Sequence, residues 1–359
     1  MNQRKLLISL IVITLTISAG IAGYLIGSPA QSHITQATIL EKFDNSITPS
    51  LSEELTKKRR LIPISQQLAI SPTNSNSKNK VLYYEKTIGR VFETAIDGRG
   101  EATISETKLP NFIQTLWSSD KQQVISQFRT PQGLQFRYYN YETKKSAAFA
   151  QNIRSIAFSP DSQEVVYFQT EGELGSIYLA LPDGSDPKKI LDTRIPEIKL
   201  EWPSAQEIIA QTNQNSTSDI LIISPEGGIT RVLTEQKGLR HSWSPSGNNL
   251  VFSSTDQGTT TLQFMNIQTK NQGTIALDTT ADKCIWSTDE RSIICAVPKS
   301  TIASEDFFRF DIITGKQELL FASDSSNPPI SVQEPFLSQG EGYLIFLNNI
   351  DNRLYSLKI

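Results

Sequence analysis

A repeated pattern of aromatic and apolar residues constrains the fold of this chain more than any other feature. Each occurrence ends a short apolar run and is followed at once by a polar turn, such as Ser-Pro-Asp-Ser from Ser159. Seven residues mark this phase: Ile70, Trp117, Phe158, Trp202, Trp243, Trp286 and Phe336. They recur at intervals of roughly 40 to 50 residues, the period of β-propeller blades. All four tryptophans of the chain hold this phase, and we therefore predict an all-β protein.

Each repeat contains four short segments that have the character of strands. In the clearest repeat the marker Phe158 ends the first segment, and a β-branched run, V-V-Y-F, begins at Val165. An alternating run follows from Ser176, and a short fourth segment begins at Lys188 after a Pro-Asp-Gly-Ser turn. One such sheet cannot bury both of its faces, so the blades must stack around an axis. The sequence predicts a seven-bladed β-propeller of four-stranded antiparallel blades over residues 59–359.

The last repeat lacks a fourth strand of its own. After Phe336 it contains a second segment and a third, Arg353 to Ile359, where the sequence ends. A segment upstream of the first marker, K-K-R-R-L-I-P-I from Lys57, resembles the fourth strand of other repeats. We therefore predict that residues near Arg59 to Ile64 pair into the last blade and close the ring, leaving no open edge there.

The repeat resembles that of the TolB-type β-propeller family, a relative of WD-repeat blades. The likeness is strongest over Phe158 to Leu191, which contains F-S-P-D-S, G-S-I-Y and P-D-G-S-D-P-K-K-I-L. The resemblance implies a propeller and says little about activity. TolB carries an α/β domain before its propeller, and prolyl oligopeptidases and dipeptidyl peptidases carry a hydrolase domain after theirs. We expect neither in this chain.

The N-terminal region has the features of a membrane anchor. Arg4 and Lys5 precede a stretch, residues 6–27, that contains no charged residue and is long enough to span a bilayer. The basic pair predicts a cytoplasmic tail at residues 1–5, a transmembrane helix at 6–27, a polar spacer at 28–58 and an extracytoplasmic propeller. The alternative is a cleaved signal peptide, because Ser28-Pro29-Ala30 resembles a cleavage site. Both interpretations place the propeller outside the cytoplasm.

Sequence motifs of catalysis are absent. The chain contains no G-x-S-x-G, G-x-G-x-x-G, P-loop or H-E-x-x-H pattern, and only two histidines, His33 and His241. We interpret His241 as a packed, hydrogen-bonded strand residue and expect no catalytic residue, metal or cofactor. The net charge of −3 argues against a nucleic-acid partner. A pair of acids contributed by different blades could still cleave glycans, so a hydrolase or lyase at the channel mouth is the alternative function.

The first strands carry a polar residue at the third position before each marker. These residues are Gln67, Gln114, Ser155, Lys199, Arg240, Lys283 and Gln333. Because the first strand of a blade is usually innermost, we expect Lys199, Arg240 and Lys283 to converge on the channel and to favour an acidic ligand. The alternative is that a water-filled channel simply requires polar walls.

Two further features concern partners and stability. Tyr138-Tyr139-Asn140-Tyr141 gives one strand aromatic side chains on both faces, which suits either a partner surface or packing between blades.

Cys284 and Cys295 are the only cysteines, and a four-residue turn at Thr288–Arg291 would set them directly opposite each other. We predict a disulfide between them, since the propeller is exported; two reduced, packed cysteines are the alternative. As a whole, the sequence favours a membrane-anchored scaffold that binds a protein or an envelope polymer.

Overall fold

The computed structural model describes residues 60–359 apart from 206, 215, 301 and 302. The expected cytoplasmic tail, transmembrane helix and spacer at 1–58 lie outside the described residues. Within the part that is described, no helix has the length and apolar character needed to cross a membrane.

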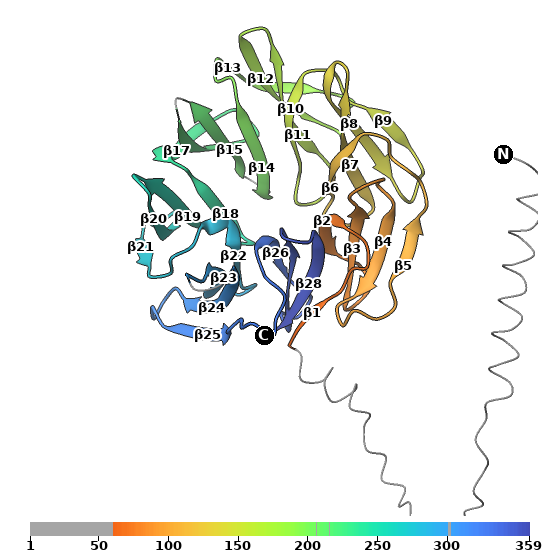
Figure 1. Cartoon of the computed structure of the whole chain (residues 1–359). Helices are drawn as coiled ribbons and strands as arrows, with labels where there is room; N and C mark the ends of the chain where they lie inside the picture. Colours follow the sequence, from red (N-terminus) through yellow and green to blue (C-terminus); the bar gives the residue numbers. More distant parts are fainter. Residues whose placement is uncertain (1–59, 206, 215, 301–302) are drawn as a thin grey trace, which may run out of the picture. The chain divides into compact units, whose positions relative to one another are not determined.

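The described chain forms seven four-stranded antiparallel sheets, which confirms the predicted propeller and its number of blades (Figure 1). From the inner to the outer strand, blade 1 contains β2 (Ala69–Asn74), β3 (Lys80–Glu85), β4 (Val91–Ala95) and β5 (Ala102–Ser105). Blade 2 contains β6 (Phe112–Trp117), β7 (Gln123–Thr130), β8 (Gly133–Asn140) and β9 (Ser146–Ala148). Blade 3 contains β10 (Ile153–Phe158), β11 (Val165–Glu171), β12 (Leu174–Ala180) and β13 (Lys188–Thr193). Blade 4 contains β14 (Ile198–Ser204), β15 (Glu207–Gln214), β16 (Thr217–Ile223) and β17 (Ile229–Lys237).

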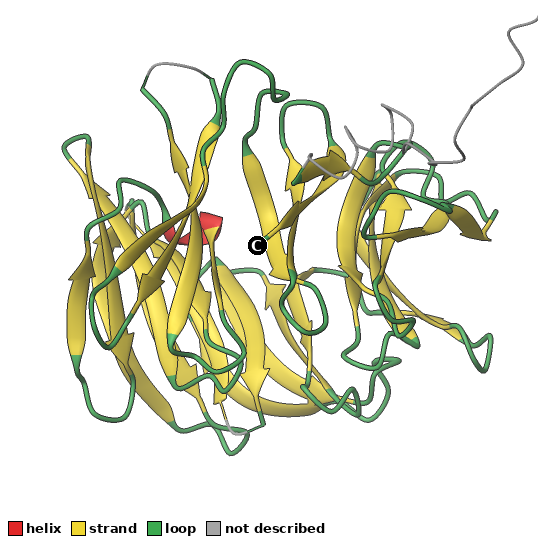
Figure 2. Cartoon of the chain, turned by 90° about the horizontal axis from the view of Figure 1, so that it is seen from below, coloured by secondary structure: helices red, strands yellow, loops and turns green. Residues whose placement is uncertain are grey.

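The remaining blades follow the same order. Blade 5 contains β18 (Arg240–Trp243), β19 (Asn249–Asp256), β20 (Thr259–Asn266) and β21 (Gln272–Ile275). Blade 6 contains β22 (Cys284–Trp286), β23 (Ser292–Pro298), β24 (Glu305–Asp311) and β25 (Gln317–Phe321), with a 3-10 turn, η1 (Ala281–Lys283), before β22. Blade 7 contains β26 (Val332–Leu337), β27 (Tyr343–Asn348), β28 (Arg353–Lys358) and β1 (Leu61–Pro63). The first strand of each blade borders the central channel, and the loops and turns lie on the two faces of the ring (Figures 1 and 2).

The ring closes through its two ends, as predicted. Strand β1 pairs antiparallel with β28, so that Ile62 lies opposite Ser356. Backbone hydrogen bonds continue on both sides of this pairing, from Lys358 N–H to the Arg60 carbonyl (2.8 Å) and from Ile64 N–H to the Leu354 carbonyl (2.8 Å). The outer strand of blade 7 therefore comes from the N-terminal end of the described chain.

A serine turn follows the first strand in six blades. The backbone N–H of the serine donates to the carbonyl of the residue that starts or directly precedes the second strand. The pairs are Ser75–Lys80, Ser118–Gln123, Ser159–Glu164, Ser244–Asn249, Ser287–Ser292 and Ser338–Tyr343. In each of these blades the first strand ends directly before the serine.

This alignment corrects two predicted markers. The structural equivalents are Asn74 rather than Ile70 in blade 1, and Leu337 rather than Phe336 in blade 7. Both first strands contain a register shift, where Ser71 (φ 51°) and Glu334 (φ 48°) adopt left-handed backbone conformations. These bulges add residues before the turn and moved the apparent marker.

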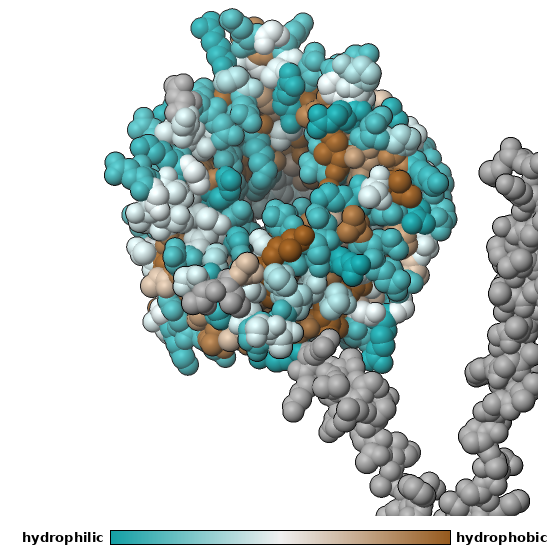
Figure 3. Space-filling model, in the orientation of Figure 1, coloured by the Kyte–Doolittle hydropathy of each residue, from teal (hydrophilic) through white to brown (hydrophobic). Residues whose placement is uncertain are grey.

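Six of the seven blade interfaces contain a cluster of buried apolar side chains. The clusters join blades 2 and 3, 3 and 4, 4 and 5, 5 and 6, 6 and 7, and 7 and 1. In the described chain no such cluster joins blades 1 and 2. Aromatic rings and hydroxyl groups meet there instead, and they leave an open cleft. The face drawn in Figure 3 is mostly hydrophilic, with scattered hydrophobic patches, because the large apolar side chains lie between blades.

Candidate functional site

The three basic residues predicted to face the channel lie on or beside the inner strands of consecutive blades. Lys199 belongs to β14 and Arg240 to β18, and both side chains are more than half exposed. Lys283 lies in η1 instead of a strand, and its side chain is only 21% exposed.

Each of the three cations has an acidic partner that sequence analysis missed. Lys199 Nζ lies 2.7 Å from Glu201 Oε1, and Arg240 Nε lies 3.6 Å from Asp282 Oδ2. Lys283 pairs with the buried Glu305, whose other carboxylate oxygen accepts the Val332 N–H (2.8 Å). An anion that binds these cations must compete with carboxylates already in place. Glu201 lies two residues after Lys199 on the same strand, β14. Asp282 belongs to the blade after that of Arg240, and Glu305 lies 22 residues after Lys283 on β24, so the local pattern gave no indication of these two partners.

His241 is buried beside Glu201, which confirms its interpretation as a packed, hydrogen-bonded residue. Its side chain is 4% exposed, and its Nε2 lies 3.2 Å from Glu201 Oε2, across the interface between blades 4 and 5. Burial disfavours the charged form of Glu201, but His241 and Lys199 outweigh this effect and lower the pKa of that carboxyl. Glu201 is therefore held ionised as the shared acceptor of two basic groups.

A second acid, Glu334, faces the channel without such support. It lines a cavity of about 390 Å³ together with His241, Asp282 and neighbouring residues of β22 and β26. Glu334 is exposed to the channel, but nearby protein atoms displace part of the water around its carboxyl and raise the pKa of that group. No basic side chain among the described residues pairs with it. Gln333, the predicted channel position in this blade, lines the same cavity; the adjacent Glu334 was not predicted, because the bulge was not recognised. Among the described residues, no group of three or more His, Cys, Asp or Glu side chains is placed to hold a metal ion.

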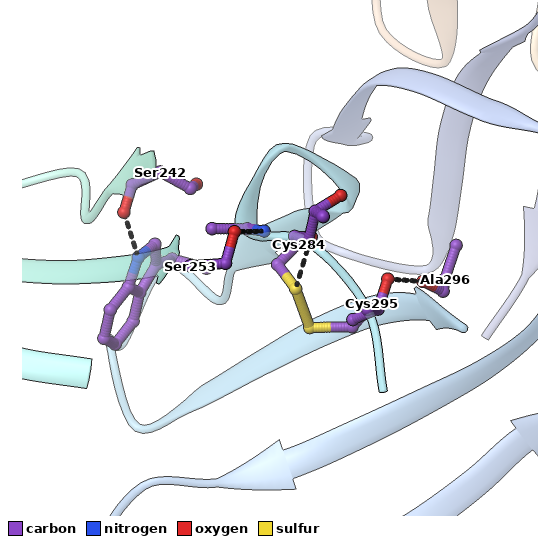
Figure 4. Close-up of a disulfide and its surroundings, with 9 residues drawn as sticks. Ser242, Ser253, Cys284, Cys295 and Ala296 are labelled. Atoms are coloured by element: carbon purple, nitrogen blue, oxygen red, sulfur yellow. Dashed lines mark hydrogen bonds between the residues drawn. A yellow bond between two sulfur atoms is a disulfide. The ribbon is translucent and has the colours of Figure 1, made fainter. Parts of the chain in front are cut away.

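The two cysteines lie directly opposite each other on β22 and β23 and are joined by a disulfide bond (Figure 4). Their Cα atoms are 4.1 Å apart, and both side chains are buried. The turn that sets this register is the expected one, because Ser287 N–H donates to the Ser292 carbonyl at 2.9 Å. The disulfide belongs to the interface of blades 5 and 6 and lies beside the channel cavity.

The cleft between blades 1 and 2 encloses about 550 Å³. Blade 1 and the following loop contribute one wall, and β7, β8 and β9 contribute the other. Its lining residues are Tyr84, Gly89, Val91, Ser105, Thr107, Lys108, Leu109, Pro110, Asn111, Val124, Ser126, Phe128, Arg137, Tyr138, Tyr139, Tyr141 and Ser146. The wall thus combines aromatic rings, hydroxyl groups and two cations, and it contains no carboxylate.

The tyrosines at the end of β8 and directly after it divide between the two faces of blade 2. Tyr138 packs in the apolar cluster shared with blade 3, whereas Tyr139 and Tyr141 contact each other edge-on, with ring centroids 5.1 Å apart. The Tyr141 hydroxyl lies 2.7 Å from that of Tyr84 in blade 1, and its ring stacks on Trp117. Burial, followed by the neighbouring Tyr84 hydroxyl, raises the pKa of Tyr141, which therefore stays neutral. Packing between blades explains Tyr138; Tyr139 remains available at the cleft.

Sequence comparison finds no matching family model and no matching curated protein. Structure comparison finds many similar folds. An oligogalacturonate lyase in complex with manganese is 11% identical, with a TM-score of 0.58, over 83% of this chain and 97% of that chain. The β-propeller domain of the Trilobed protease from Pyrococcus furiosus is 11% identical, with a TM-score of 0.56, over 81% and 96% of the two chains. TolB from Acinetobacter baumannii is 12% identical, with a TM-score of 0.46, over 80% and 78%.

At these identities the similarity concerns the fold alone. The similar structures include an oligogalacturonate lyase and a domain of a protease, so the shared fold does not indicate one activity. The chain is a seven-bladed β-propeller, similar in fold to an oligogalacturonate lyase and to the β-propeller domain of the Trilobed protease.

Proposed function

We propose that this protein is an extracytoplasmic binding or scaffolding module that holds a protein or an envelope polymer. The observation that carries the proposal is the cleft between blades 1 and 2. It occupies the one interface in the described ring where an apolar cluster is replaced by tyrosines, hydroxyl groups and unpaired cations. A concave site of this size, with aromatic walls and a few polar groups, is typical of ligand binding.

The location outside the cytoplasm forms part of the same proposal. Residues 6–27 would anchor the chain as a single transmembrane helix, with residues 1–5 in the cytoplasm, or would be removed as a signal peptide. The disulfide between Cys284 and Cys295 supports export, because such bonds persist mainly in oxidising compartments.

A comparison of two tyrosine variants tests the proposal. Tyr139→Ser removes an aromatic wall of the cleft, whereas Tyr178→Ser makes the same change at the packed interface of blades 2 and 3. Immobilised full-length protein should retain material from an envelope fraction, and Tyr139→Ser should retain much less of it. Equal retention by Tyr139→Ser and the parent protein, with both still folded, would rule out the cleft as the binding site.

One observation favours a second candidate, a glycan-active hydrolase or lyase at the channel mouth. Glu334, Asp282 and His241 line a single cavity, and the pKa of Glu334 is raised, as in a carboxyl group that donates a proton. Acidic and neutral oligosaccharides should then be cleaved by the parent protein and not by Glu334→Gln. Absence of new reducing ends or unsaturated products with both substrate classes would remove this candidate.

A further inference from the structure

We infer that the cleft between blades 1 and 2 binds a carboxylate-bearing sugar segment, such as a uronate residue of an acidic polysaccharide. This inference rests on the proposed binding function and names the class of its ligand. Arg137 and Lys108 line the cleft, and neither forms an ion pair with any described residue. The nearby Glu106 pairs with Arg90 instead (3.4 Å). A cleft with two free cations and no lining carboxylate attracts an anion.

Arg137 is placed to receive a carboxylate. It lies on β8 with its guanidinium 5.0 Å from the centroid of the Phe128 ring, and the residue is exposed. Stacking on the ring restrains the guanidinium plane and leaves its N–H groups free to donate outwards. A planar guanidinium binds a carboxylate through two parallel hydrogen bonds, which a lysine cannot do.

The remaining wall suits a sugar ring. Tyr139 and Tyr141 meet edge-on and both line the cleft; Tyr141 is held by Trp117 and Tyr84, which leaves Tyr139 as the ring for a ligand. The C–H face of a pyranose packs on the electron-rich face of an aromatic ring. Ser105, Thr107 and Ser146 line the same space and can exchange hydrogen bonds with sugar hydroxyls.

Most of the cleft wall offers no open sheet edge to an extended peptide. A peptide can bind a sheet by adding a strand to an open edge. Strands β4 and β8 are paired on both sides, and the outer strands β5 and β9, whose edges are open, contribute only Ser105 and Ser146 to the lining. Recognition in the cleft therefore rests mainly on side chains, as it does for a polar ring-shaped ligand.

The test uses full-length protein in detergent and a short oligogalacturonide, with its methyl ester as the uncharged counterpart. Calorimetry should show that the acid binds and that the ester binds more weakly. Affinity for the acid should also fall when the salt concentration is raised. Arg137→Gln should reduce affinity for the acid roughly tenfold or more, as expected on loss of a charged hydrogen bond. Arg129→Gln is the matched control, because Arg129 is exposed on β7 and does not line the cleft.

The outcomes separate this inference from the proposed function. Equal affinity for acid and ester would overturn the carboxylate class and leave a glycan site. Failure of both sugars, together with Tyr139-dependent retention of an envelope protein, would overturn the sugar class while the binding function stands. Unchanged affinity in Arg137→Gln would show that any bound acid sits elsewhere.

Discussion

Glu334 shows how a single residue combines backbone strain with an unfavourable charge. It occupies a bulge with φ 48°, a conformation that non-glycine residues rarely adopt, and it faces the channel cavity. The residue is exposed, but protein atoms of the channel displace part of the water around the carboxylate and raise its pKa. Strained backbone conformations and perturbed pKa values are both concentrated at functional sites. For this reason we expect the alternative, enzymatic function to depend on Glu334.

We expect Glu334→Gln to stabilise the protein at neutral pH. A carboxyl whose pKa is raised by folding costs stability wherever it is ionised, that is, above its ordinary pKa of about 4.3. The cost is absent below that pH, because the group is protonated in both the folded and unfolded states. The melting temperature of the variant should exceed that of the parent at pH 7, and the difference should vanish below about pH 4. A difference that is constant with pH would show that charge is not its cause.

Trp202 and Trp286 mark the same position in two repeats, but their indole N–H groups have different surroundings. Trp286 Nε1 donates to the Ser242 carbonyl of blade 5 (3.1 Å; Figure 4), whereas Trp202 Nε1 is buried and has no partner among the described residues. Both side chains are less than a tenth exposed, so replacement by phenylalanine leaves a similar cavity at each site.

We expect Trp286→Phe to destabilise the protein by about 1 kcal/mol more than Trp202→Phe. The first change leaves a carbonyl without its donor, whereas the second removes a polar group that was already unsatisfied. Urea unfolding of the two variants measures the difference. Equal losses, or a larger loss at Trp202, would mean that the Trp202 indole finds a partner in solution.

At the scale of strands, the repeat period and the alternation of side chains were sufficient to predict the number of blades, their order and the register of Cys284 against Cys295. Two bulges were not predictable, because Ser71 and Glu334 adopt conformations that usually indicate glycine. The contact between Glu201 and His241 was missed for another reason. It forms only because the ring brings neighbouring blades together, and no local sequence pattern encodes it. The ion pair of Lys199 with Glu201, two residues further along the same strand, was visible in the sequence.

The disulfide on the β22–β23 hairpin predicts that denatured, unreduced protein contains no free thiol. Reduction should lower the free energy of unfolding by about 3 kcal/mol or less, because the loop that the bond closes is short. A variant with serine at both Cys284 and Cys295 should be insensitive to reductant. Two titratable thiols per chain in the unreduced parent would contradict the bond.

At the scale of the whole propeller, the seven interfaces differ in strength. Six contain an apolar cluster, and the interface of blades 7 and 1 includes residues from both ends of the described chain, among them Ile64 and Leu354. Among the described residues, the interface of blades 1 and 2 holds no such cluster and contains the cleft instead. Because one interface lacks an apolar cluster, we expect the stability of the ring to depend more strongly on the other interfaces, including the closure of blade 7 by β1.

Deletion of residues 57–64 tests that dependence. The deletion removes β1 and the buried Leu61 and Ile64, so β28 becomes an unpaired edge and the cluster between blades 7 and 1 loses a member. We expect limited proteolysis to cut the variant much faster than the parent, with early cuts in blade 7. Deletion of residues 41–48, an equally long segment of the expected spacer, should leave the cleavage rate of the propeller unchanged. If the protein without residues 57–64 resists protease as well as the parent, another segment fills the place of β1, and the ring does not depend on this closure.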